Sequence, residues 1–265
     1  MARGIDELNS VIDSYREVIR KSDLFGKTIE CLQSYNISKI RCLALGSFAE
    51  EFPAKYQLAL LLEILDNINT IKEVSLYDPV FNEVDKLFIK EQSNWHIVEQ
   101  EHYQDTGNCG ETLFYMPHAP LDLTEEVIKR EKPKLILGNE MSQHTDRYTE
   151  KQLYDKYPLL SKLVYGSKNY SKVSNPKINV SAEGDGFVRQ ESKKSRRRKN
   201  KWHIEPTVID YSSVPSYFAD GLIMITNYKS SSTSEDGENT TVDLIKKGQE
   251  QWNHSFSDLS LFEIA

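Results

Sequence analysis

Hydrophobic residues recur at two spacings along the chain, and each spacing predicts one kind of element. Repeats of three and four residues predict amphipathic helices over residues 5–19, 28–35, 53–68, 81–88 and 123–131. Short apolar runs between them predict buried strands over 40–45, 74–77, 95–98, 112–116 and 134–137, with further strands over 202–210 and 221–226. Pro53 suits the first turn of its helix, because the N–H that proline lacks would be unpaired there.

Strands alternating with helices indicate an α/β protein, and strands that are apolar throughout indicate a parallel sheet buried on both faces. We therefore predict a Rossmann-like parallel sheet with helices on both faces, N-terminal helices and a long insertion before the last strand. Residues 1–165 would hold the N-terminal helices and the main part of this domain. Residues 166–201 would be a basic flexible insertion, and 202–265 would supply the remaining strands of the same domain. A second polar stretch runs from Lys229 to Thr241.

Charge and composition limit the classes of partner and the cellular locations that we expect. The formal net charge of −7 over 265 residues argues against nucleic acid and anionic membranes. The longest apolar run, Leu58–Leu62, has five residues, and the N-terminus lacks the apolar stretch of a signal peptide, so we expect no membrane span and no secretory leader. Three cysteines without a paired spacing are typical of a reduced intracellular protein (Cys31, Cys42 and Cys109).

One basic run stands apart from the acidic average. Lys193–Lys201 places seven positive charges in nine residues, which matches a nuclear-localisation string that an import receptor could read. The alternative is a solvated loop, since blocks of like charge are commonly mobile. The predicted location is the cytoplasm, with nuclear entry left open.

The residues most suggestive of a site follow the predicted strands, where open parallel sheets bind ligands. Turn formation is the competing explanation for each of them. As cofactor-binding candidates we take Gly46, Ser47, Phe48, Asp78, Pro79, Met116, Pro117, His118, Gly138 and Asn139.

Asp78 and His118 are the two candidates with the most specific chemical roles. A carboxylate after the second strand can bind the ribose of a nucleotide or of S-adenosylmethionine, although a turn-forming Asp-Pro competes with that role. NAD is disfavoured, because GxGxxG is absent and Asp78 lies 32 residues beyond Gly46. His118 is the catalytic candidate: it follows the fourth strand, where many methyltransferases keep a proline-rich loop, and it could act as a general base, a metal ligand or a hydrogen-bond donor. The competing explanation is an imidazole bonded to a neighbouring loop carbonyl. With His144, His118 is a weak metal or haem candidate, since no third ligand has a recognisable spacing.

Several strings, in order along the chain, resemble the SRR (sensitivity to red light reduced)-like family. They are Leu45–Phe48, Gln57–Ala59, Tyr77–Phe81, Tyr115–His118, Gly138–Asn139 and, near the end, Phe256–Leu261. Asp-Pro-Val-Phe and Met-Pro-His are rare strings, so the resemblance is specific. The chain departs from the pattern at Ala119, where relatives often have cysteine, and at Ser257, where asparagine is usual. The serine-rich and basic segments are more typical of fungal than of plant members.

The resemblance implies a regulatory protein with an unidentified protein partner and no established reaction. Relatives are linked to light and circadian signalling, to haem regulation and to microtubule-related phenotypes. Two alternatives stay open: an S-adenosylmethionine- or nucleotide-dependent enzyme resembling a methyltransferase, and a haem- or metal-responsive protein.

Overall fold

The computed structural model describes residues 2–104, 109–165, 209–218, 222–227 and 255–264. Its helices are α1 (Ala2–Arg20), α2 (Asp23–Leu32), α3 (Phe52–Asn67), α4 (Glu83–Glu91), α5 (Leu121–Glu131), α6 (Met141–Thr145) and α7 (Glu150–Lys156). Residues 158–165 are also helical, and Cys109–Glu111 and Tyr211–Ser213 form 3₁₀ turns. The strands are β1 (Lys39–Leu43), β2 (Glu73–Tyr77), β3 (Trp95–Ile97), β4 (Thr112–Met116), β5 (Leu135–Asn139), β6 (Leu222–Asn227) and β7 (Leu259–Ile264).

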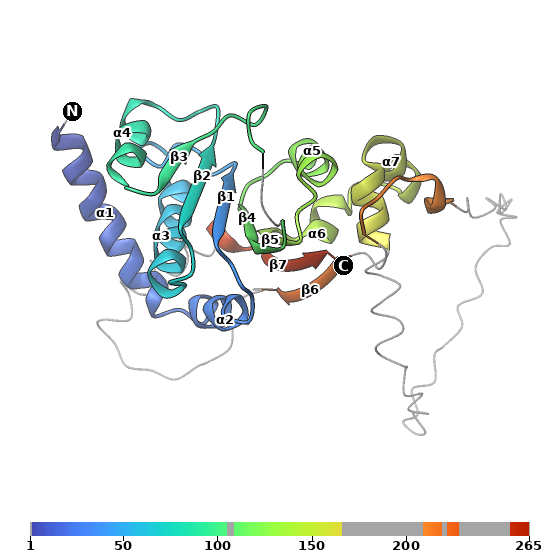
Figure 1. The fold of residues 1–265 in the computed structure, drawn as a ribbon, viewed down its shortest axis with the longest axis horizontal. Coiled ribbons are helices and arrows are strands. Elements are labelled where there is room, and N and C mark those ends of the chain that lie inside the picture. The colour runs from blue at the N-terminus through green and yellow to red at the C-terminus, as the bar shows by residue number, and fades with distance from the viewer. Residues whose placement is uncertain (1, 105–108, 166–208, 219–221, 228–254, 265) are drawn as a thin grey trace, which may run out of the picture.

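These strands form one mixed sheet in the order β3-β2-β1-β4-β5-β7-β6 (Figure 1). Strands β1 to β5 are parallel, which confirms the α/β prediction, but β7 runs antiparallel to both β5 and β6. Apolar periodicity does not encode strand direction, so this reversal could not be predicted from it. The strand predicted over 202–210 lies outside the described residues except for Ile209 and Asp210, which are not in a strand. The insertion predicted over 166–201 and the stretch 229–241 also lie outside them.

Both faces of the sheet are covered, as the apolar strands predict. Alternate residues of β4 divide between two cores: Leu113 and Tyr115 face α1 to α4, and Phe114 and Met116 face α5 to α7. Figure 1 shows α1 and α7 at opposite ends of the molecule. On α1, four of the seven apolar residues at helical spacing are buried (Ile5, Leu8, Ile12 and Ile19), and the other three are partly buried (Val11, Tyr15 and Val18).

Local side chains account for several element boundaries. Helix α2 begins at Asp23 rather than near Thr28, because the Ser22 hydroxyl accepts the Phe25 N–H and caps the helix there. Pro53 lies in the first turn of α3, as predicted. Strand β1 ends at Leu43, two residues earlier than predicted, since Ala44 has a φ of 54° and turns the chain.

A buried charge interrupts the apolar pattern of β1. The Arg41 side chain is fully buried and donates to the Val98 carbonyl (3.0 Å) and to Gln100 (3.3 Å). Its guanidinium lies 4.1 Å from the centre of the Tyr103 ring. Burial lowers the pKa of Arg41, which the nearby Glu131 carboxylate partly offsets. Residues 98–103 thus cover the Arg41 side chain, close to Glu131 at the end of α5.

Candidate functional site

The strand order reverses beside β1, and the predicted site residues gather around this point. Strands β2 and β3 lie to one side of β1, and β4 and β5 lie to the other. In open α/β sheets the carboxyl ends of strands at such a reversal commonly form a ligand site. We call the loops after β1, β2, β4 and β5, together with Asp258 before β7, the strand-end edge.

Asp78 joins the first two loops of the strand-end edge. Its carboxylate accepts the Gly46 N–H (2.8 Å) and the Val80 N–H (3.0 Å). Gly46 has a φ of 78°, a conformation in which glycine carries no steric penalty. Asp78 therefore has the turn-forming role that competed with ribose binding, although its two oxygens retain further acceptor capacity.

The other candidates in these loops are divided between core and surface. Phe48 is fully buried, with edge contacts to Phe81 and Phe88, so it belongs to the core. Ser47 is buried, and its hydroxyl accepts from the Asn82 amide (3.3 Å). Pro79 is exposed at the rim. Of the five candidates in these two loops, Pro79 is thus the exposed one, and Gly46 and Asp78 are partly buried.

Strands β4 and β5 approach each other closely at Gly138. This residue pairs with Met116, and a Cβ built on it would lie 2.8 Å from the Met116 carbonyl oxygen. Gly138 and Asn139 were predicted to follow β5, but both lie inside it, since β7 pairs with them at Ser260 and Leu259. The partner strand comes from the far end of the sequence, which explains why the local pattern ended the strand too early.

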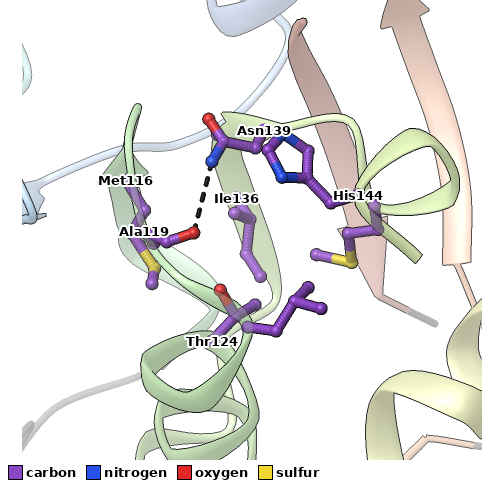
Figure 2. Close-up of a pocket in the computed structure, with 9 residues that line it drawn as sticks. Met116, Ala119, Thr124, Ile136, Asn139 and His144 are labelled. Atoms are coloured by element: carbon purple, nitrogen blue, oxygen red, sulfur yellow. Dashed lines mark hydrogen bonds between the residues drawn. The ribbon is translucent and has the colours of Figure 1, made fainter. Parts of the chain in front are cut away.

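Asn139 leaves one polar atom without a partner. Its amide nitrogen donates to the Ala119 carbonyl (3.2 Å), the bond drawn in Figure 2. Its oxygen Oδ1 is buried and has no hydrogen-bond donor within the described part of the chain. A buried acceptor in this state costs about 1–3 kcal/mol, unless a water in the adjoining cavity or a bound group donates a hydrogen bond to it.

His144 and Asp258 form a pair that the sequence reasoning did not find. His144 Nε2 is hydrogen-bonded to Asp258 Oδ2, and the Glu140 N–H donates to the Asp258 carbonyl (2.6 Å). The Glu140 carboxylate accepts the N–H groups of Ser142 and Gln143, which fixes the start of α6 and hence the position of His144. The one available signal was the Phe256–Leu261 string, which contains Asp258 but does not identify its partner.

His118 shares the electrostatic field of this pair. Although the residue is exposed, neighbouring atoms desolvate its ring and lower its pKa, and His144 lowers it further. The carboxylates of Asp258 and Glu51 act in the opposite direction. The hydrogen bond from His144 in turn lowers the pKa of Asp258, against the effect of burial. The structure thus brings His118, His144 and Asp258 within electrostatic reach of one another.

The cavity found at this edge is too small for a nucleotide, and the described residues offer no cluster of metal ligands. Among the described residues, no group of three or more His, Cys, Asp or Glu side chains could hold a metal ion. The cavity between Met116, Ile136, Asn139 and His144 measures about 10 Å³ (Figure 2). That is room for about one water molecule, whereas small-molecule sites commonly enclose 300 Å³ or more.

No helix within the described ranges is long and apolar enough to cross a lipid bilayer.

Comparison with known proteins points to one family. Residues 25–263 match the family model of the SRR1 domain. The SRR1-like protein of Mus musculus is 26% identical over 132 residues, which is 47% of this chain and 53% of the mouse protein. The chain therefore aligns with about half the length of this curated relative.

Proposed function

The chain belongs to the SRR1 domain family, and on that premise we propose that it is a regulatory protein whose strand-end edge binds a small ligand or a protein partner. The observation that carries the proposal is the buried Asn139 Oδ1, which has no donor among the described residues and lies at the end of β5, on the cavity that Ala119 and His144 also line. A partner that supplies an N–H or O–H group would satisfy this acceptor.

The shape of the edge favours a partner over an enclosed ligand. The cavity of about 10 Å³ holds no ligand of nucleoside size. Pro79, Val80 and His118 are exposed in the loops of the strand-end edge, and the side chain of Val80 is an exposed large apolar group. An exposed imidazole and an exposed apolar side chain in the loops of one edge suit a protein contact, in which hydrogen bonds add specificity to burial.

The cellular role belongs to the same proposal. Family resemblance supports a part in light or circadian signalling, haem regulation or microtubule-related processes. We further propose residence in the cytoplasm with nuclear entry through Lys193–Lys201, a run outside the described residues. Deletion of 193–201 from a fluorescently tagged full chain would then abolish nuclear signal, and unchanged nuclear signal would contradict the nuclear part of the proposal.

A second candidate is an S-adenosylmethionine-dependent enzyme. The strand order, with β7 antiparallel between β5 and β6, is shared by many such methyltransferases, which is an analogy of fold alone. In this reading Asp78 would bind the ribose and His118 would lie near the acceptor. The present cavity does not fit an adenosyl group, so the surrounding loops would have to open.

A thermal-shift screen separates these candidates. The purified full chain is mixed with S-adenosylmethionine, S-adenosylhomocysteine, ATP, NAD and haem. A ligand at 100 times its dissociation constant stabilises the folded state by about 2.7 kcal/mol, a shift of several degrees. A shift with the two adenosyl compounds that Asp78→Asn abolishes would support the enzyme, whereas a haem shift lost in His118→Ala would support the haem-responsive alternative.

If none of these compounds raises the melting temperature, the next test looks for a protein partner. Proteins co-purifying with the native chain are compared with those of an Asn139→Ala/His118→Ala variant and of a matched Lys86→Ala/Lys90→Ala variant on α4. A partner lost only from the first variant supports the proposal. Identical sets from all three chains, with no ligand shift, would overturn it.

A further inference from the structure

A larger hollow lies away from the strand-end edge, and the proposed function does not use it. It measures about 730 Å³ and lies between α5, the end of α7 and residues 213–217. We call it the α5–α7 groove. Its volume falls within the range of ordinary small-molecule sites.

Hydrogen bonds within the protein already engage most polar groups around the groove. The Glu125 carboxylate accepts the N–H groups of Leu159 and Leu160 at 2.9 and 2.8 Å, and so caps the helix over 158–165. The Tyr217 hydroxyl donates to the Pro133 carbonyl (2.6 Å), and the hydroxyls of Tyr154 and Ser213 are bonded to each other (3.2 Å). These groups set the walls and have limited capacity left for a ligand.

The lysine side chains around the groove, in contrast to these polar groups, have few partners within the protein. Lys129 and Lys132 are both exposed, and neither is within 4.0 Å of a carboxylate in the described part of the chain, although the charge of Lys129 lowers the pKa of the nearby Glu125. Lys156 is 4.0 Å from Asp122, a long contact with a largely exposed carboxylate. The one remaining acid of the lining, Glu126, faces Arg130 at 3.6 Å. The recognition capacity left over is therefore cationic.

Apolar groups supply the rest of the lining. Ile128, Leu159 and Val214 are buried, and they form a floor that the second core supports from below. Tyr217 is an exposed large apolar residue whose ring is held by its bond to Pro133. An aromatic ring fixed in this way offers contact area at low entropic cost.

From this arrangement we propose that the α5–α7 groove binds a small anionic molecule with an aromatic or apolar body. The body would lie on Val214 and Tyr217, and the anionic group would be bound by Lys129 and Lys132. Anionic ligands and lysine ammonium groups attract each other most strongly where part of the contact is shielded from water. This site is independent of the strand-end edge, so either proposal can fail without the other.

The test uses the full chain and the fluorescent probe 8-anilinonaphthalene-1-sulfonate, an aromatic sulfonate. Its uncharged analogue N-phenyl-1-naphthylamine is the matched probe. We expect Lys129→Glu/Lys132→Glu to weaken sulfonate binding about tenfold or more, which corresponds to ~1.4 kcal/mol, and to leave binding of the neutral probe within about twofold. Added salt should weaken binding of the sulfonate and leave binding of the neutral probe unchanged, because salt screens the attraction between exposed charges.

Two further variants locate the site. Tyr217→Ala should weaken both probes, since it removes part of the apolar wall. Lys86→Glu/Lys90→Glu makes the same change of charge on α4, and sulfonate binding should stay as in the parent chain. Near-UV circular dichroism confirms that each variant is folded. Equal loss in the α4 variant, or sulfonate binding that Lys129→Glu/Lys132→Glu leaves unchanged, would overturn the proposal.

Discussion

The strand-end edge and the α5–α7 groove differ in how their polar groups are used. At the edge, Asp78 accepts two backbone N–H groups and His144 is bonded to Asp258, while the cavity has room for about one water. In the groove, Lys129 and Lys132 project around a hollow of about 730 Å³. The residues with the most suggestive chemistry therefore hold loops together, and the open volume lies among residues with no recognisable motif.

Polar side chains thus have two different uses in this molecule: some satisfy the backbone, and others remain open to a ligand. Loops at the ends of buried strands have backbone N–H groups that water cannot easily reach, so Asp and Asn side chains are needed there to satisfy them. At the end of α5, Lys129 and Lys132 are exposed to water, so their ammonium groups remain available to bind an anionic ligand. Substitutions should thus reduce stability strongly at the edge and weakly at the groove.

The largest effect is expected from Gly138→Ala. The added Cβ would lie 2.8 Å from the Met116 carbonyl oxygen, a backbone atom that can move only if β4 and β5 separate. Overpacking of this kind commonly costs about 1–3 kcal/mol. Chemical denaturation measures the change. Gly110→Ala is the matched control, because the nearest atom to its Cβ would be 3.8 Å away, at the flexible Lys134 side chain. Equal stability of the two variants would show that β4 and β5 are not tightly apposed.

Asp78→Ala should have the next largest effect. The N–H groups of Gly46 and Val80 lose their acceptor, and a partly buried donor left unsatisfied costs about 1–3 kcal/mol. Asp155, an exposed residue of α7, supplies the control, since such surface substitutions usually change stability by less than about 0.5 kcal/mol. Urea unfolding of both variants gives the comparison. If Asp78→Ala is as stable as Asp155→Ala, Asp78 is not the residue that ties the first two loops.

Much of the fold could be predicted from the sequence, because periodicity reports burial directly. Strands β1 to β5 and helices α1, α3 and α5 were all anticipated within a few residues. The antiparallel β7 was not, since its direction depends on pairing with β5 across more than a hundred residues. Arg41 also escaped notice, because a single charge in an apolar run gives no sign that Val98, Gln100 and Tyr103 will enclose it.

The candidate site was less predictable than the fold. Sequence position indicated which residues follow strands, but it could not separate Phe48, which fills the core, from His118, which is exposed. The His144–Asp258 bond joins residues 114 positions apart, so no local pattern connects them. The α5–α7 groove went unpredicted for the same reason, because its walls come from three separate segments.

A smaller, pH-dependent effect should follow from His144→Ala. The hydrogen bond from His144 lowers the pKa of Asp258 in the folded state. Such a group stabilises the fold above the unfolded aspartate pKa, which is about 3.9, and that contribution is lost as pH falls through the lower folded value. The parent chain should therefore exceed His144→Ala in unfolding free energy at pH 6, and the gap should narrow towards pH 3. His96→Ala, at an exposed position of β3, should show no such change, and a constant gap for His144→Ala would contradict the role of the pair.

The smallest expected effect is on the pH dependence of stability in a His118 variant. It tests whether this imidazole contributes to the stability of the fold or remains free to contact a partner. Desolvation lowers its pKa in the folded state, so the unfolded chain takes up the proton first as pH falls. Stability attached to the neutral ring is present above the unfolded histidine pKa of about 6.5 and is lost as pH falls through the lower folded value. The melting temperature of the parent chain should thus fall between pH 8 and pH 5 by slightly more than that of His118→Gln, which cannot titrate. Because the residue is exposed, water screens most of this difference. A large difference would place His118 with Asp78 among the residues that hold the edge together, whereas a small one keeps it as the group free to meet a partner.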